Sequence, residues 1–221
     1  MENQYRYNDR DVSWLSFNHR VLLEADDDEL PLYERINFIS IYSSNLEEFY
    51  KVRVAGHKAV VSGGKNEEET VEEAHAIIHK ITERVNAQLE DRIRIYEQKI
   101  LPGLRKNHII FYQSKNELGE IHRQFIQRFF KEEVFPFLQP VQVDKERVRM
   151  FLRDRRLYLA VRAIEKESRI KEYFILKMPY SKVPRFVQLP KIGDDYYIMF
   201  LEDIIKYNLN KIFIGYDIDC S

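Results

Sequence analysis

The densest group of polar side chains in this chain lies between Ile41 and Arg53, where the sequence reads IYSSNLEEFYKVR. Within it, Asn45 carries a carboxamide that both donates and accepts hydrogen bonds, which is what reading the edge of an adenine ring requires. Asn45 followed by Glu48 also has the pattern of a helix N-cap with its capping-box partner, and capping explains an asparagine there without any ligand. Both roles stay open from the residues alone, and they can coexist if the helix begins at the wall of a cleft.

Basic residues follow on the same predicted helix, at Lys51, Arg53 and Lys58. They would favour phosphate or polyphosphate electrostatically, although a solvated basic face is the simpler interpretation of any one of them. Arg53 is the strongest candidate for a phosphate contact, because a guanidinium can hold phosphate oxygens through two parallel hydrogen bonds.

Other residues that could carry chemistry are scattered. His75 and His79 stand four apart, a spacing that could bind a metal on a helix, but no carboxylate or cysteine pattern completes the site and we expect surface histidines. A later basic cluster could hold a polyphosphate, an acidic protein surface or another domain of the same protein. A solvated role is equally open, because Glu146 and Asp154 dilute the charge. The members of this cluster are Lys145, Arg147, Arg149, Arg153, Arg155 and Arg156.

The sequence lacks recognisable signatures of catalysis. It contains no glycine-rich phosphate loop ending in Lys-Ser/Thr and no protein-kinase signature. No pair of carboxylates and no nucleophile with a matching histidine stands out. We therefore assign no catalytic residue and no metal ligand to this chain.

Composition limits the class of protein. The 221 residues are 44% hydrophobic and 32% charged, which predicts a globular protein with a real core. The formal net charge of -1 excludes a global polycation made to coat nucleic acid, so any polyanion site must be local. The single cysteine, Cys220, cannot form an intramolecular disulfide, and no apolar run approaches the roughly 20 residues of a membrane helix.

The helical spacing of apolar residues predicts that residues 1–105 form a helical bundle. The first helix is expected from Ser13 to Ala25, with Asp11 or Ser13 as its cap. Trp14 and Phe17 are interpreted as core residues of this helix.

Three more helices complete the predicted bundle. One begins at Pro31 after a solvated turn at Asp26-Asp27-Asp28, and the next begins at Asn45. A long helix with one apolar stripe is expected from about Glu67 to Leu101, where Pro102-Gly103 stops it.

Residues 106–221 predict a mixed α+β domain, in which strands and aromatic residues replace the helical stripes, so the whole chain is assigned to the α+β class. The segment Ile212–Ser221 shows no closing element, which we interpret as a truncated domain. The expected strands are Ile109–Tyr112, Leu157–Ile164, Tyr173–Leu176 and Tyr196–Phe200, with one helix at Gly119–Val134 and another that follows Phe200 and runs through Tyr207.

Three segments, in this order and spacing, resemble the amino-terminal domain of bacterial polyphosphate kinase: Ser13–Asn18, Pro31–Arg35 and Ile41–Arg53. The segment Lys182–Pro190, with its unusual Val-Pro-Arg-Phe stretch, is a second marker of the same family. The resemblance covers most of the chain. It implies a helical amino-terminal domain followed by part of the head domain of this enzyme.

The resemblance also implies a function. Polyphosphate kinases of this type reversibly transfer the terminal phosphate of ATP to inorganic polyphosphate through a phosphohistidine. That histidine and the magnesium ligands belong to carboxy-terminal domains with a phospholipase-D-like fold, and no position here matches them. The asparagine of the family that contacts adenine matches Asn45, and the head domain contributes dimer contacts.

From this resemblance we expect a fragment of the enzyme that is inactive by itself. Within the whole protein it would contact ATP or ADP and serve polyphosphate synthesis, with Asn45 on the adenine and Arg53 as a weaker candidate on phosphate. Homo-oligomers would form through the head domain, and no nucleic-acid partner is expected. The expected location is the cytoplasm, with a peripheral position at the inner membrane left open.

A second hypothesis comes from another class of protein. The chain would then be a non-catalytic helical interaction module, whose α+β half binds a protein or a phosphoinositide through the basic cluster between Arg147 and Arg156. The reading frame beyond Ser221 separates the two hypotheses. A long continuation with a phospholipase-D-like histidine-lysine motif supports the enzyme, whereas a stop codon favours the module.

Overall fold

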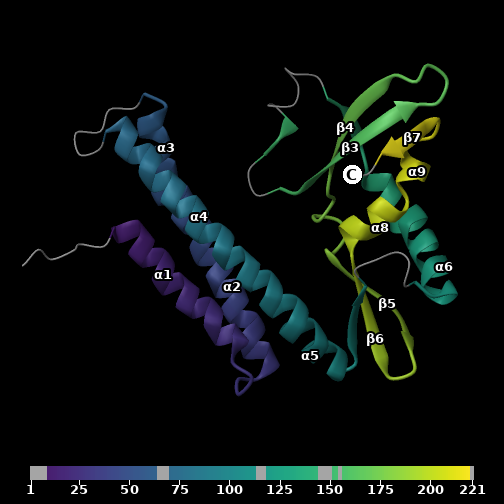
Figure 1. Ribbon diagram of the computed structural model, residues 1–221. Helices are drawn as coiled ribbons and strands as arrows, with labels where there is room; N and C mark the ends of the chain where they lie inside the picture. The colour runs from purple at the N-terminus through teal and green to yellow at the C-terminus, as the bar shows by residue number, and fades with distance from the viewer. Residues whose placement is uncertain (1–8, 64–69, 113–117, 144–150, 154–155, 220–221) are drawn as a thin grey trace, which may run out of the picture. The chain divides into compact units, whose positions relative to one another are not determined.

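The computed structural model describes residues 9–63, 70–112, 118–143, 151–153 and 156–219. The chain divides into two compact units, Met1–Asn107 and His108–Ser221. The first unit is helical, and the second combines two small sheets with short helices (Figure 1). The predicted α+β class is therefore confirmed.

The first helix, α1 (Arg10–Leu23), begins earlier than predicted. Asp9 is its cap, because the Asp9 carboxylate accepts hydrogen bonds from the backbone N–H groups of Asp11 and Val12. A short 3₁₀ turn, Glu24–Asp26, extends the far end. The predicted cap at Asp11 or Ser13 is thus wrong by two or more residues.

The buried stripe of α1 also differs from the predicted one. Phe17 is half exposed, so its assignment to the core is wrong, and Trp14 is only partly buried, with its ring stacked 4.7 Å from that of Phe49. The buried positions follow a four-three-four spacing along another line of the helix. They are Asp11, Leu15, Asn18 and Leu22.

The second helix, α2 (Leu32–Phe49), follows Pro31 and runs through Ser43, Ser44 and Asn45 without a break. The predicted helix start at Asn45 is therefore wrong. The hydroxyl of Ser43 donates back to the carbonyl of Ile39 at 2.8 Å, the carbonyl one turn earlier in the helix, so this polar side chain is satisfied within α2. Burial of Tyr42 and Phe49 on one side holds the helix through this polar stretch.

A π-helical turn, Tyr50–Val54, joins α2 to α3 (Ala55–Val61). α3 ends at the Ser62-Gly63 step, where Gly63 has a φ of 90°, a conformation that favours glycine. The residues that follow, 64–69, lie outside the described part of the chain.

The long helix begins at α4 (Val71–Ile95), where Thr70 and Glu73 form a capping box. It continues through a π-helical turn, Tyr96–Ile100, into α5 (Leu101–Lys106). The predicted stop at Pro102-Gly103 is wrong, because Pro102 lies in the first turn of α5, where a missing N–H costs little. Gly103 lies against Leu32, and a Cβ there would be 2.8 Å from a methyl carbon of that leucine.

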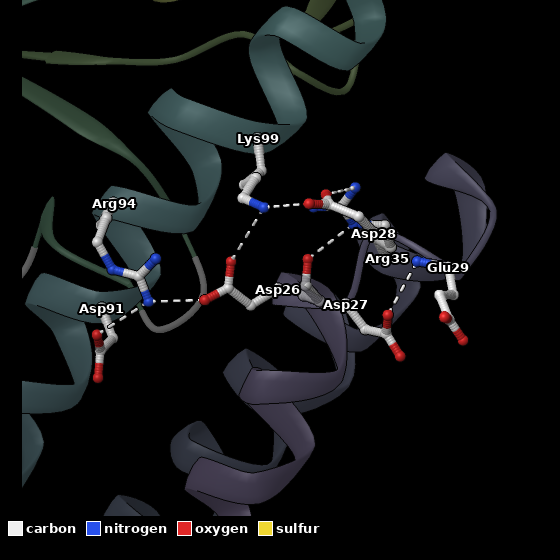
Figure 2. Close-up of polar contacts among 9 residues, drawn as sticks. Asp26, Asp27, Asp28, Glu29, Arg35, Asp91, Arg94 and Lys99 are labelled. Atoms are coloured by element: carbon white, nitrogen blue, oxygen red, sulfur yellow. Dashed lines mark hydrogen bonds and ion pairs between the residues drawn. The ribbon is translucent and has the colours of Figure 1, made fainter.

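The turn between α1 and α2 is tied to the long helix by charge pairs (Figure 2). Arg94 donates to Asp26 at 2.9 Å, and Lys99 pairs with Asp28. On the other side, the buried Arg35 donates to Asp28 at 3.0 Å. The acidic turn was predicted to be solvated, but its carboxylates instead join the helices through ion pairs.

The second unit contains two sheets. The three-stranded sheet has the order β1-β6-β5, with β1 parallel to β6 and β5 antiparallel to it. The four-stranded sheet has the order β2-β4-β3-β7, with every pair antiparallel. The strands are β1 (Ile109–Tyr112), β2 (Pro140–Gln142), β3 (Tyr158–Glu165), β4 (Lys171–Lys177), β5 (Phe186–Ile192), β6 (Asp195–Phe200) and β7 (Tyr216–Asp219).

β3 and β4, which cover two of the expected strands, pair as an antiparallel hairpin, but the prediction of no closing element after Ile212 is wrong. β7 pairs with β3, with Ile218 opposite Ala163. The four residues of β7, Tyr-Asp-Ile-Asp, alternate apolar and polar side chains, a short strand pattern that the prediction overlooked.

Helices pack beside these sheets and complete one apolar core. α6 (Glu120–Phe129) extends through a π-helical turn to Val134, as predicted, and two short helices, α8 (Leu201–Tyr207) and α9 (Leu209–Ile212), follow β6. Fully buried members of the core include Ile126, Leu176, Leu201 and Ile204. Among the described helices of both units, none is long and apolar enough to cross a membrane.

Candidate functional site

Asn45 lies near the C-terminal end of α2, half-buried between helices rather than at a helix start. Its amide nitrogen, Nδ2, donates to Oδ1 of Asn18 on α1 at 3.0 Å. The capping-box interpretation of Asn45 and Glu48 is therefore wrong, and Glu48 is exposed. The carboxamide that the sequence singled out is instead held by another carboxamide from a different helix.

Asn18 itself has no exposed surface. Its Nδ2 donates to the backbone carbonyl of Tyr42 at 3.1 Å, while its Oδ1 accepts from Asn45. A buried amide with both ends engaged is stabilising, whereas an unpartnered one would cost about 1–3 kcal/mol. We call this series, Tyr42 carbonyl to Asn18 to Asn45, the amide relay.

A second buried amide lies in the same three helices. Gln88 on α4 accepts from the Tyr42 hydroxyl at 3.3 Å and donates to the carbonyl of Leu15 at 3.0 Å. Burial raises the pKa of the Tyr42 phenol to about 12, so the hydroxyl stays protonated as a donor. α1, α2 and α4 are thus joined by polar side chains inside the bundle.

Arg53 lies about two turns beyond Asn45, roughly 12 Å along the helix. Its Nε is 3.9 Å from Asp11 Oδ1, and His57 Nε2 is 2.9 Å from the other oxygen of that carboxylate. Asp11 is buried and His57 is partly buried, whereas the Arg53 side chain is about 44% exposed. Arg53 therefore leaves a large part of its guanidinium open to solvent.

These three residues line a cavity of about 590 Å³ in the helical unit. The charged side chains around it are Arg10, Asp11, Arg53, His57, Glu73 and Lys80, together with Asp9. The three carboxylates are engaged: Asp9 caps α1, Asp11 pairs with His57 and Arg53, and Glu73 forms the capping box of α4. The cavity therefore has mixed charge, with the exposed cations Arg10 and Lys80 beside the Arg53 and His57 pairs to Asp11.

The remaining basic candidates of this segment fit the solvated interpretation. Lys51 pairs with Glu47 one turn earlier on the helix, and Lys58 is exposed. His75 and His79 are both exposed, and His79 lies 3.5 Å from Glu83. Across the ranges that the structure describes, no three His, Cys, Asp or Glu side chains gather as a metal site.

Only part of the later basic cluster can be described. Arg153 and Arg156 are exposed. Lys145, Arg147, Arg149 and Arg155 lie outside the described residues.

The Val-Pro-Arg-Phe marker has a structural role in the second unit. Arg185 donates through Nε and Nη2 to one oxygen of Glu202, at 2.9 and 2.7 Å, and Tyr180 donates to the other oxygen at 2.8 Å. Burial alone would raise the pKa of Glu202, but the hydrogen bonds from its own backbone N–H, Arg185 and Tyr180 outweigh it and lower that pKa. This marker therefore fastens the start of α8 to the segment before β5.

Comparison with known proteins accounts for both units. Residues 7–112 match the family model of the polyphosphate kinase N-terminal domain, and residues 121–221 match that of the polyphosphate kinase middle domain. The chain belongs to the polyphosphate kinase family. This membership confirms the resemblance drawn from the ordered segments of the sequence, and it favours the kinase hypothesis over the interaction module.

Individual relatives agree with this assignment. The chain is 38% identical to a polyphosphate kinase of Halalkalibacterium halodurans over 96% of its length and 34% identical to one of Vibrio parahaemolyticus over 98%. The crystal structure of the polyphosphate kinase from Porphyromonas gingivalis superposes with a TM-score of 0.87 at 43% identity, over 99% of this chain and 32% of that one. The chain spans 30–31% of the length of these two curated relatives.

Sequence reasoning missed three residues of this region. Asn18 and Asp11 are polar residues in the buried stripe of α1, and His57 joins Asp11 from the helix after Arg53. A polar residue that recurs in step with Leu15 and Leu22 was the available signal, because such a position must find a hydrogen-bond partner inside the bundle.

Proposed function

We propose that this chain is the amino-terminal part of a polyphosphate kinase that transfers the terminal phosphate of ATP to inorganic polyphosphate. Two family matches in the expected order and a solved relative that aligns along nearly the whole chain support this. The phosphohistidine and magnesium chemistry of the resemblance would come from parts of the enzyme with no counterpart here. The chain alone is then inactive, and polyphosphate formed from ATP by the purified chain would refute that.

In this proposal Asn45 contacts the adenine of ATP. The observation that carries it is the half-buried carboxamide, which donates one N–H to Asn18 and whose Oδ1 and second N–H have no hydrogen-bond partner among the described residues. A carboxamide fixed by a neighbour loses less conformational entropy on binding than a free one. The contact is thus preorganised by the helical unit.

The test is an Asn45→Ala variant of the whole kinase. Loss of two hydrogen bonds to the base should raise the KM for ATP about tenfold or more, with little change in the KM for polyphosphate. The matched control is Ser44→Ala, at the exposed neighbouring position. An ATP KM that is the same in both variants and in the wild type would refute the adenine contact.

Arg53 is proposed as a weaker contact with phosphate, supported by its exposed guanidinium at the cavity beside Arg10 and Lys80. In the same assay Arg53→Ala should raise the KM of a phosphate-bearing substrate, and that effect should weaken at high ionic strength. Lys51→Ala, which removes a charge already paired with Glu47, is the control. Equal effects of the two variants would contradict a specific role for Arg53.

The head portion is proposed to contact a second copy of the protein. One face of the three-stranded sheet carries Phe111, Phe186 and Phe200, whose rings touch, and Phe186 is 56% exposed. An apolar cluster on one face suits a two-fold interface, in which the same patch meets itself. A Phe186→Asp variant should shift the enzyme toward monomer in sedimentation, and an unchanged oligomer would refute this surface.

The cytoplasmic location stays a prediction.

A further inference from the structure

The amide relay has a fixed direction. It starts at the backbone carbonyl of Tyr42, which lies within α2, can only accept, and cannot rotate. The NH₂ group of Asn18 must therefore face this carbonyl, and its Oδ1 must face the other way. Oδ1 in turn accepts from the NH₂ group of Asn45. The orientation of the Asn45 amide is thus set by a group two hydrogen bonds away.

This orientation decides which base edge Asn45 can read. With one N–H committed to Asn18, the amide presents its oxygen as an acceptor and its second N–H as a donor. Adenine offers the complement, the N6 amino donor beside a ring-nitrogen acceptor. Guanine offers the reverse order, the O6 acceptor beside the N1–H donor, and would suit an amide turned by 180°.

We propose that Asn18 is a positioning and specificity-determining residue, which holds the Asn45 amide in the orientation that favours adenine over guanine nucleotides. Asn18 does not touch the nucleotide and acts only through Asn45. The proposal rests on the adenine contact of Asn45 proposed above. Asn18 is buried and makes two oriented hydrogen bonds, which distinguish it from a residue that merely fills the space between α1 and α2.

The test compares ATP with GTP as phosphate donor in the whole kinase. Asn18→Leu keeps the volume but removes the acceptor, so the Asn45 amide can turn and the ratio of kcat/KM for ATP over GTP should fall about tenfold or more. If this variant does not fold, Asn18→Ser takes its place, because its shorter side chain does not reach both partners.

Two controls separate orientation from stability. Asn18→Asp retains an oxygen that faces Asn45, so the preference for ATP should persist even if the protein is less stable. Gln88→Met removes buried hydrogen bonds from the same helices without touching Asn45, so it should lower stability and leave the ATP to GTP ratio unchanged.

The outcomes distinguish this inference from the proposed function. An unchanged ratio in Asn18→Leu or Asn18→Ser, in a kinase where Asn45→Ala weakens ATP use, overturns the role of Asn18 and leaves the adenine contact intact. A fall of the ratio in Gln88→Met equal to that in Asn18→Leu also overturns it, because the effect would then be structural. If Asn45→Ala leaves ATP use unchanged, the adenine contact itself is overturned.

Discussion

Each unit of the chain contains a buried polar relay that starts at a backbone carbonyl, and the two relays end differently. In the second unit, the carbonyl of Pro190 accepts from His122 Nε2 at 2.8 Å, and the other ring nitrogen accepts from the Tyr112 hydroxyl at 2.8 Å. Both His122 and Tyr112 are buried. In the helical unit, the amide relay leads instead from the fully buried Asn18 to the half-buried Asn45.

This difference separates stability from recognition. A relay that stays inside the core can only fix the packing of the unit, as His122 does beside the ring of Tyr197 at 4.5 Å. A relay that reaches a partly exposed group also passes its orientation to something that a ligand can touch. Variants of the second unit should therefore change stability alone, whereas variants of the helical relay should change nucleotide use.

The largest expected effect tests the relay of the second unit. His122→Leu leaves the Pro190 carbonyl and the Tyr112 hydroxyl without this partner in the core, so the free energy of unfolding should fall by about 2–4 kcal/mol. His79→Leu, at an exposed position, should change it by less than about 0.5 kcal/mol. Chemical denaturation measures both. A selective rise in the KM for ATP in His122→Leu would break the distinction between the two relays.

A smaller effect is expected inside the helical unit, where the Tyr42 hydroxyl donates to Gln88. Tyr42→Phe leaves Gln88 Oε1 without its donor and should cost about 1–2 kcal/mol. The pH dependence is specific: burial raises the pKa of Tyr42 from 10.0 to about 12, so the unfolded chain loses this proton first. The wild type should lose this contribution as the pH rises from 10 toward 12, and the variant should not. Parallel stability curves for the two proteins above pH 10 would contradict the assignment.

The smallest effect is expected at Glu202 in the second unit, which accepts hydrogen bonds from Arg185 and Tyr180. Because its hydrogen bonds lower the Glu202 pKa, this group contributes stability above its unfolded pKa and loses it as the pH falls through the folded value. Glu202→Gln should cost about 1 kcal/mol at neutral pH, a modest figure because Arg185 is half exposed. Glu202→Gln should also reduce the loss of unfolding free energy as the pH is lowered. A loss at acid pH as large as that of the wild type would exclude the Glu202 interactions as its cause.

The sequence predicted most of the helices and strands, because their apolar residues recur at regular spacing. The long helix was clear from its period of 3.6, and the strands β3 and β4 from their runs of apolar and aromatic residues. Prediction from the sequence failed where tertiary contacts override the local preference of the residues. The polar stretch at Asn45 looked like a turn, yet the burial of Tyr42 and Phe49 keeps it helical.

The candidate site was predictable only in part. Asn45 stood out by its chemistry and by resemblance, but its partner Asn18 is 27 residues earlier in the chain. Asn18 was overlooked because a polar residue in a helix is normally assigned to the exposed face, and only the crossing of α1 and α2 places it inside. β7 was missed for a different reason: its alternation of apolar and polar residues covers only four positions, which is a weak signal until its pairing with β3 is known.

The central claim is that Asn45 reads adenine in the orientation set by Asn18, and a double-mutant cycle tests it most directly. The ratio of kcat/KM for ATP over GTP is measured for the wild-type kinase, Asn18→Leu, Asn45→Ala and the double variant. Asn18→Leu should lower the ratio in the wild-type background and leave it unchanged once Asn45 is alanine. An equal fall in both backgrounds would contradict the claim, because Asn18 would then act by a route that does not pass through Asn45.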